Sequence, residues 1–334
     1  MDRLEAFLKK KEAMLGGVSD KEERSIRNNI KRQHDISASI GIYPRQLAIE
    51  TVNHCNAECV MCPYPQMKRH KGTMSEEVHR LIIDKIAVWN APIETISHAG
   101  MGEPLLDRKI EQKIIYEKQI FTNAKVAIYS NVSVLNEKRA GQILESGVDI
   151  LSVSLNGYSK DVYETVMKLP FERTQRNLHR FIKLNNERGH PIQINVSLIP
   201  TKHHSKKEIE NFCSYWDGKV DAVIVPPHIG WGGFFDLGVK KTQYPCRYIF
   251  EVLQIDWDGT VAMCCEDYET KYPLGNLKEQ GPQEVFNSPT LQEQRRRMVE
   301  GDFTLPPICV DCIESHEVAR QYWKQAEVLP LSKI

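Results

Sequence analysis

The sequence predicts an α/β fold, namely a partial (β/α)6 barrel of the TIM type followed by a small cysteine-rich domain. Six short segments rich in β-branched residues recur between residues 46 and 228, and helical patterns separate them. Alternating strands and helices are typical of parallel β/α units, and six units are fewer than the eight of a closed barrel. No predicted strand is followed by the Gly-x-Gly-x-x-Gly of a dinucleotide site, which disfavours the alternative, a doubly wound sheet.

Residues 1–43 are expected to form a helical arm that covers the barrel from outside. Apolar residues recur at helical spacing from Leu4 onward. Ser19 and Glu22 have the pattern of a capping box, which starts a second helix carrying Ile26 and Ile30.

The barrel is expected over residues 44–230. Its helices are indicated by the spacing of Val78, Ile82 and Ile86 after a cap at Thr73, and by the pattern over residues 138–149. Because parallel strands end at the same edge of a barrel, we expect the working residues after the strands. The six strands are predicted at residues 46–53, 95–100, 125–131, 150–156, 192–199 and 222–228.

The second domain is expected over residues 231–334. Residues 252–267 have the pattern of a hairpin whose turn is at Asp258 and Gly259. The run Arg295 to Arg297 follows a helical segment, and we expect it on a solvated face.

Charge and composition disfavour several classes of function. The 334 residues include 44 Lys and Arg against 44 Asp and Glu, so no net charge attracts a nucleic-acid backbone or an anionic membrane surface. No apolar run reaches the roughly 18 to 20 residues of a membrane helix, and the charged N-terminus is unlike a signal peptide. We therefore expect a cytoplasmic protein. Its nine cysteines then favour metal ligation or catalytic thiols over disulfides.

A first group of cysteines follows the first predicted strand. Cys55, Cys59 and Cys62 form a C-x3-C-x2-C run. Three thiolates this close in sequence can hold an iron-sulfur cluster and leave one iron without a protein ligand. Structural zinc sites usually pair C-x2-C with a second pair elsewhere, so zinc is disfavoured here.

A second group of five cysteines lies in the last ninety residues. Four thiolates from a hairpin and a terminal loop suffice for a fully ligated [4Fe-4S] cluster. Zinc fits the same pattern equally well on chemistry alone. The five are Cys246, Cys264, Cys265, Cys309 and Cys312.

The C-x3-C-x2-C run after the first strand of a partial barrel resembles the hallmark of the radical S-adenosylmethionine (SAM) superfamily. The resemblance implies a [4Fe-4S] cluster on Cys55, Cys59 and Cys62, whose open iron binds the amino and carboxylate groups of S-adenosylmethionine. Reduction by one electron then yields a 5'-deoxyadenosyl radical, which abstracts a substrate hydrogen. The resemblance also implies a flavodoxin- or ferredoxin-type electron donor.

Further cofactor contacts are implied by the same resemblance. Gly102, Glu103 and Pro104 after the second strand resemble the family's Gly-Gly-Glu-Pro motif, although Met101 interrupts the glycines. This motif places a carboxylate near the cofactor's ammonium group. Further candidates are Ser130, Asn131, Ser154 and Asn156 for ribose and carboxylate contacts, and Met61 at a position where the family often has an aromatic residue against adenine. The four strand-end residues alternatively cap the helices and turns that follow.

The C-terminal cysteines resemble the start of the SPASM domain of radical enzymes. Cys246, Gly259 and Cys264 fit its C-x12-G-x4-C spacing, and the usual middle cysteines are absent. The truncated form, called a twitch domain, also occurs in radical enzymes that dehydrogenate aminocyclitols. The resemblance implies a second [4Fe-4S] cluster on Cys246, Cys264, Cys309 and Cys312, although Cys265 stands next to Cys264.

A fully ligated second cluster suits electron transfer better than substrate binding. We therefore expect a hydroxyl of a small polar substrate, a sugar or an aminocyclitol, to be oxidised to a ketone in a biosynthetic pathway. His98, His228 and Trp231 are candidate substrate contacts, because a neutral histidine can accept the hydroxyl proton.

Four alternatives remain open. One is epimerisation of a sugar carbon with Cys265 as hydrogen donor. Others are modification of a ribosomally made peptide and decarboxylation of a sugar acid. A non-enzymatic zinc or iron-sulfur scaffold is the last, but it would not need the Gly-Glu-Pro turn.

Overall fold

A computed structural model of the chain describes residues 42–226, 230–235 and 245–302, together with residues 24, 26, 28, 308, 309 and 312. Most of the predicted N-terminal arm therefore lies outside the described residues. Ile26, which belongs to its predicted apolar stripe, is buried. Among the described residues, no helix is both long and apolar enough to cross a membrane.

Six parallel strands form the barrel, and all six sequence predictions are confirmed. They pair in chain order, so that β1 neighbours β2 and the series continues to β6. The six strands could be predicted from the sequence because they are rich in apolar β-branched residues, which favour strands. The strands are β1 (Gln46–Ile49), β2 (Thr95–His98), β3 (Lys125–Ser130), β4 (Ile150–Ser154), β5 (Gln193–Ser197) and β6 (Ala222–Ile224).

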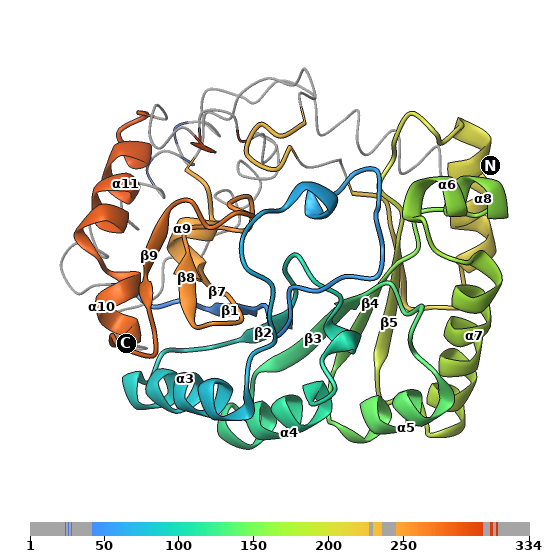
Figure 1. The fold of residues 1–334 in the computed structure, drawn as a ribbon, viewed down its shortest axis with the longest axis horizontal. Coiled ribbons are helices and arrows are strands. Elements are labelled where there is room, and N and C mark those ends of the chain that lie inside the picture. Colours follow the sequence, from blue (N-terminus) through green and yellow to red (C-terminus); the bar gives the residue numbers. More distant parts are fainter. Residues whose placement is uncertain are drawn as a thin grey trace.

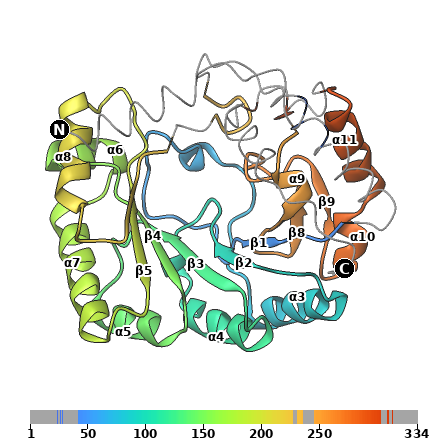
Figure 2. The ribbon, with the colours of Figure 1, turned by 180° about the vertical axis from the view of Figure 1, so that it is seen from behind.

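Helices cover the outer side of the curved sheet, as Figures 1 and 2 show for α3, α4, α5 and α7. The first begins two residues later than a capping box at Thr73 predicts. Its N-cap is Ser75, whose hydroxyl accepts a hydrogen bond from the Val78 amide. The helices are α3 (Glu76–Trp89), α4 (Ile110–Ile120), α5 (Glu137–Glu145), α6 (Lys160–Met167), α7 (Phe171–Glu187) and α8 (Lys206–Trp216), with short 3-10 helices η1 (Tyr64–Gln66) and η2 (Pro104–Leu106).

Alternation along the strands separates the core from the inner side of the barrel. Large apolar residues such as Leu47, Ile96 and Val126 are fully buried in the main core. The residues that follow them, including Ala48 and Ser97, are small or polar, and these two line a cavity. Successive side chains of a strand point to opposite faces, so the same strands build the core and the cavity wall.

The C-terminal strands continue the barrel sheet. Strand β7 (Val252–Ile255) pairs in parallel with β1, and Ile255 lies opposite Ile49. The predicted hairpin is confirmed, since β8 (Thr260–Ala262) runs antiparallel to β7, with Gly259 at φ +87° in the turn. The remaining elements are α9 (Tyr248–Glu251), β9 (Pro273–Asn276), α10 (Pro282–Phe286) and α11 (Pro289–Val299).

The expectation that Arg295 is solvated is wrong. Its side chain is buried, and it donates hydrogen bonds to the carbonyl oxygens of Ile249 (2.6 Å) and Phe286 (2.8 Å). Burial lowers the pKa of Arg295 to about 9. The guanidinium satisfies carbonyls at the ends of helices α9 and α10, and thereby ties α11 to both.

The β1–β7 pairing predicts a specific stability effect. Leu253 on β7 is fully buried, and Leu253→Ala should lower the free energy of unfolding by about 2–5 kcal/mol, because it leaves a cavity. The matched control Leu81→Ala, on the 40% exposed Leu81 of α3, should change it by about 0.5 kcal/mol or less. Urea unfolding measures both, and equal effects would contradict the packing described.

Candidate functional site

The candidate site is a cavity of about 440 Å³ at the carboxyl ends of the barrel strands. This is the edge where parallel barrels carry their working residues. Most sequence-predicted site residues meet here. The cavity is lined by Cys55, Cys59, Met61, Cys62, Gly102, Glu103, Ser130, Asn131, Ser154, Asn156, Cys264 and Cys265, among others.

Apart from His98, the predicted residues that do not line the cavity are of three kinds. Pro104 is buried beside it and starts helix η2. His228 lies outside the described residues. Cys246, Cys309 and Cys312 are half-buried and are not among the described lining residues.

The first cysteine group sits on the loop after β1. The Cys55 sulfur accepts a hydrogen bond from the Ala57 amide, and the Cys62 sulfur accepts one from the Tyr64 amide, each at 3.5 Å. The Tyr64 hydroxyl in turn accepts a hydrogen bond from the Cys55 amide at 2.8 Å. Amide donors aimed at sulfur are the hydrogen bonds that tune iron-sulfur clusters.

The electrostatics of these thiols fit a cluster. Burial raises the pKa of Cys55 to about 12, and burial followed by the nearby Cys62 and Cys55 thiolates raises the pKa of Cys59 further. Three buried thiolates repel one another, so they need positive charge among them, and iron supplies it on binding. Among the described residues, no three His, Cys, Asp or Glu side chains are placed to share a single metal ion.

Glu103 is a buried carboxylate of the site, with 2% of its surface exposed. Its Oε1 accepts a hydrogen bond from the Ser130 hydroxyl (2.7 Å) and its Oε2 accepts one from the Asn131 amide (2.8 Å). Burial raises the pKa of Glu103, and these donors oppose the rise. The structure therefore places Ser130 and Asn131 as supports of Glu103. A buried carboxylate held in this way suits a cationic ligand group such as an ammonium.

Glycine is required at position 102 by a close backbone approach. A Cβ atom there would lie 1.9 Å from the Val52 carbonyl oxygen. The next residue, Glu103, donates its backbone N–H to the His54 carbonyl at 2.8 Å. The Gly-Glu-Pro turn is thus pressed against the start of the cysteine loop.

Asn56 joins the cysteine loop to β3. Its Oδ1 accepts a hydrogen bond from Asn131 Nδ2 (3.1 Å), and its own Nδ2 donates to the Ser133 hydroxyl (2.7 Å). These side-chain bonds hold the loop over the strand ends. Asn56 lies inside the C-x3-C-x2-C run but was not among the sequence-predicted site residues.

Ser154, Asn156 and Met61 complete the described cofactor candidates. Asn156 has φ +52°, and its Oδ1 accepts a hydrogen bond from the Ile199 amide at 2.8 Å. Met61 is buried, and its carbonyl accepts a hydrogen bond from Trp231 Nε1 at 3.0 Å. Trp231 itself, a candidate substrate contact from the sequence, lines the cavity.

The second cysteine group adjoins the same cavity. Burial raises the pKa of Cys264 well above its usual range, and the neighbouring Cys265, Cys309 and Cys312 raise it further. Cys264 therefore lies close to all three. Both Cys264 and Cys265 line the cavity. Although they are neighbours in the sequence, neither side chain is turned away from the cavity.

The expectation that His98 contacts substrate is wrong. His98 is fully buried on the outer side of β2, where its Nε2 lies 2.9 Å from Glu117 Oε2. His79 Nε2 lies 2.7 Å from the other oxygen of Glu117. This pairing lowers the pKa of Glu117 to about 2 against the opposing effect of its burial. His98 faces α4 because it shares a strand face with the core residue Ile96.

Four charged cavity residues, Glu50, Arg69, Asp256 and Asp267, were not among the sequence predictions, and the first three interact. Arg69 donates two hydrogen bonds to the Glu50 carboxylate, at 2.8 and 2.5 Å, and its Nη1 lies 3.4 Å from Asp256 Oδ2. All three line the cavity. Glu50 follows β1 and Asp256 follows β7, so their position directly after strands was the signal that could have revealed them.

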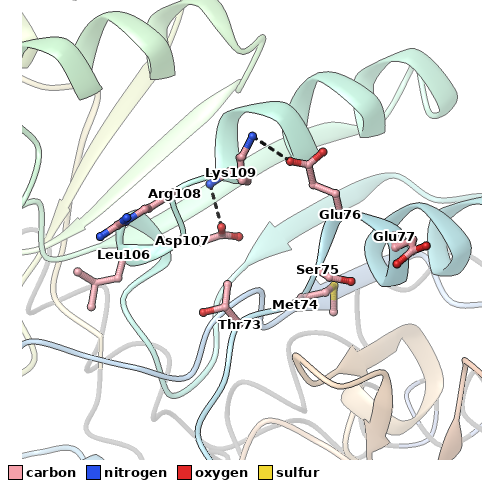
Figure 3. Close-up of a pocket in the computed structure, with 9 residues that line it drawn as sticks. All are labelled: Thr73, Met74, Ser75, Glu76, Glu77, Leu106, Asp107, Arg108 and Lys109. Carbon is pink, nitrogen blue, oxygen red and sulfur yellow. Dashed lines mark hydrogen bonds and ion pairs between the residues drawn. The ribbon is translucent and has the colours of Figure 1, made fainter.

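A second hollow, of about 640 Å³, lies where α3 and α4 begin (Figure 3). Several of the charged residues that line it are paired. Lys109 Nζ lies 3.3 Å from Glu76 Oε1, and Asp107 Oδ2 accepts a hydrogen bond from Lys113 Nζ. None of the cysteines is among its described lining residues. We therefore place the site in the cavity that the cysteines share.

Two family models match the chain. The model of the radical SAM superfamily matches residues 49–214, and that of SPASM, an iron-sulfur cluster-binding domain, matches residues 246–313. The chain is 21% identical over 271 residues to the S-adenosyl-L-methionine-dependent 2-deoxy-scyllo-inosamine dehydrogenase of Niallia circulans. That alignment covers 80% of this chain and 91% of the dehydrogenase.

Solved structures share the fold. BtrN in complex with AdoMet and 2-DOIA is 18% identical, with a TM-score of 0.58 over 81% of this chain and 94% of BtrN. Streptococcus suis SuiB bound to precursor peptide SuiA is 16% identical, with a TM-score of 0.65 over 84% of this chain and 73% of SuiB. Both likenesses support the barrel with its C-terminal extension.

The close approach at Gly102 predicts a large effect of one methyl group. Gly102→Ala should lower the free energy of unfolding by about 1–3 kcal/mol, because the Val52 carbonyl must move. The matched control is Gly141→Ala, whose new Cβ meets nothing within 4 Å in helix α5 and should be neutral or stabilising. Urea unfolding of both variants measures this, and equal stabilities would contradict the contact.

Proposed function

The chain belongs to the radical SAM superfamily, and we propose that it oxidises a hydroxyl group of a sugar or an aminocyclitol to a ketone. As a radical SAM enzyme with a C-terminal SPASM domain, it has two groups of cysteines. The observation that carries the proposal is that Cys55, Cys59 and Cys62 from one group and Cys264 from the other line a single cavity. A substrate there lies within reach of both.

In this proposal, residues 44–230 generate the radical. Cys55, Cys59 and Cys62 hold a [4Fe-4S] cluster with an open iron, and Glu103 receives the ammonium group of S-adenosylmethionine. When bound, cluster and cofactor supply a carbon radical that removes a hydrogen atom from the substrate. Ser130 and Asn131 keep the Glu103 carboxylate in place through their hydrogen bonds. Met61, Ser154 and Asn156 frame the rest of the cofactor.

Residues 231–334 carry the electron acceptor in this proposal. Cys246, Cys264, Cys309 and Cys312 hold a second [4Fe-4S] cluster. With four protein ligands such a cluster would have no iron free for substrate, and it would supply an acceptor for the second electron of the oxidation. A flavodoxin- or ferredoxin-type protein supplies the reducing electron to the first cluster.

The substrate class is inferred from the cavity and from the relative. The cavity wall has polar side chains from several strands, among them Ser97, Ser154 and Gln254. Such groups match the hydroxyls of a small polyol. Similarity over 80% of the chain to a 2-deoxy-scyllo-inosamine dehydrogenase favours an aminocyclitol or a related sugar.

Epimerisation is the second candidate, because Cys265 also lines the cavity. A thiol there could return a hydrogen atom to a substrate carbon. The product would then have the oxidation state of the substrate.

Reconstitution under anaerobic conditions tests the cofactor assignment. The wild type should contain about eight irons and release 5'-deoxyadenosine from S-adenosylmethionine with dithionite, whereas Cys59→Ala should contain about four and release none. Cys309→Ala should keep nucleoside release but lose ketone formation from 2-deoxy-scyllo-inosamine. Cys213→Ala, in helix α8 outside both groups, is the control and should retain both. Bound zinc without nucleoside release would refute the assignment.

Cys265→Ser separates the two candidate reactions. A dehydrogenase should still form ketone in this variant, because the thiol takes no part in oxidation. An epimerase would instead incorporate one deuterium from D₂O into a product of unchanged oxidation state, and Cys265→Ser would abolish that. Mass spectrometry of the products decides between them.

A further inference from the structure

Four carboxylates line the cavity among the described residues, and in three of them both oxygens accept hydrogen bonds from the protein. Both oxygens of Glu50 accept hydrogen bonds from Arg69. Both oxygens of Glu103 accept from Ser130, Leu105 and Asn131, and both of Asp267 accept from the amides of Lys271 and Tyr272.

Asp256 differs from these three. Its Oδ2 accepts a hydrogen bond from the Thr270 hydroxyl at 2.6 Å and faces Arg69 at 3.4 Å. Its Oδ1 accepts no hydrogen bond from the described part of the chain. Asp256 Oδ1 is therefore the one cavity carboxylate oxygen, among the described residues, that accepts no hydrogen bond from the described part of the chain.

The strand register places Asp256 beside Glu50. Ile255 lies opposite Ile49 in the parallel pair of β7 and β1, so the next residues of both strands end side by side. Glu50 is 2% exposed and Asp256 is 4% exposed. Two buried carboxylates share the guanidinium of Arg69, and the Glu50 charge this close opposes the ionisation of Asp256.

The surroundings of Asp256 raise the pKa of its carboxyl group to near neutral pH. Burial, and then the Glu50 charge, raise the pKa of Asp256 to about 7, while Arg69 and the Thr270 hydroxyl oppose the rise and Asp258 adds to it. Arg69 is itself fixed, because its Nε donates to the Tyr268 carbonyl at 2.8 Å. A group with a pKa near the working pH is the most effective general base.

We propose that Asp256 accepts the hydroxyl proton of the substrate when the alcohol becomes a ketone, through its Oδ1. This inference rests on the dehydrogenation proposed above. Loss of a hydrogen atom from the alcohol carbon leaves a substrate radical that still bears its O–H group. The O–H bond then breaks, its proton goes to Asp256, one electron goes to the iron-sulfur cluster of the second cysteine group, and the C=O bond forms. Glu50 and Arg69 are positioning residues that tune the proton acceptor.

Asp256→Asn tests this role, since asparagine keeps an acceptor for Thr270 but cannot take the proton. With 2-deoxy-scyllo-inosamine as probe, the variant should still release 5'-deoxyadenosine, while ketone formed per nucleoside falls at least about tenfold. Asp84→Asn on the exposed side of α3 is the matched control and should keep the wild-type ratio.

Infrared titration gives a readout independent of turnover. The protein is labelled with ¹³C-aspartate and reconstituted. The C=O band of the protonated Asp256 carboxyl group should disappear as the pH is raised through about 7, and it should be absent from Asp256→Asn at every pH. Glu50→Gln should move this midpoint to lower pH by about one unit, because it removes the like charge while Arg69 stays.

The outcomes separate this inference from the proposed function. An unchanged ketone ratio in Asp256→Asn, with an active wild type, would overturn the role of Asp256 and leave the dehydrogenase intact. An Asp256 band that titrates near pH 4 would overturn it too. A wild type that forms nucleoside but no ketone would refute the proposed function, and with it the role assigned here.

Discussion

The parallel pairing of β1 with β7 is the constraint on which the rest of the structure depends. The loop after β1 carries the first cysteines, and the hairpin that β7 opens carries Cys264. Because both strands lie in one sheet and end at the same edge, the two cysteine groups meet at one cavity without a separate domain interface. The same register sets Glu50 beside Asp256, so the charges of the cavity also follow from this pairing.

Buried hydrogen bonds then give the cavity its shape. Glu103 is held by donors from β3, and Asn56 ties the cysteine loop to the same strand end. The barrel strands supply apolar residues to one face and small or polar residues to the other. Each strand therefore contributes to stability and to the site at once, and substitutions on its two faces have different consequences.

The sequence was sufficient for the strands, the hairpin and the first cysteine group, because period, turn residues and spacing are local signals. His98 was wrongly predicted to contact substrate. It is two residues from Ile96 on the same strand, so the two side chains share the face that packs into the core. Arg295 was misplaced because its partners, the carbonyls of Ile249 and Phe286, lie on other helices. Glu50 and Asp256 could be paired only by knowing that β7 joins β1, which is a long-range contact that no local pattern encodes.

The β1–β7 pairing also bears on how the protein assembles. It joins segments roughly two hundred residues apart, and contacts of such separation form late in folding. During synthesis the N-terminal half emerges first, so the cysteine loop exists before the strand that walls its cavity. Until β7 docks, the Cys55, Cys59 and Cys62 thiols are open to water and oxidants. Oxygen during expression should therefore damage nascent chains more than finished ones.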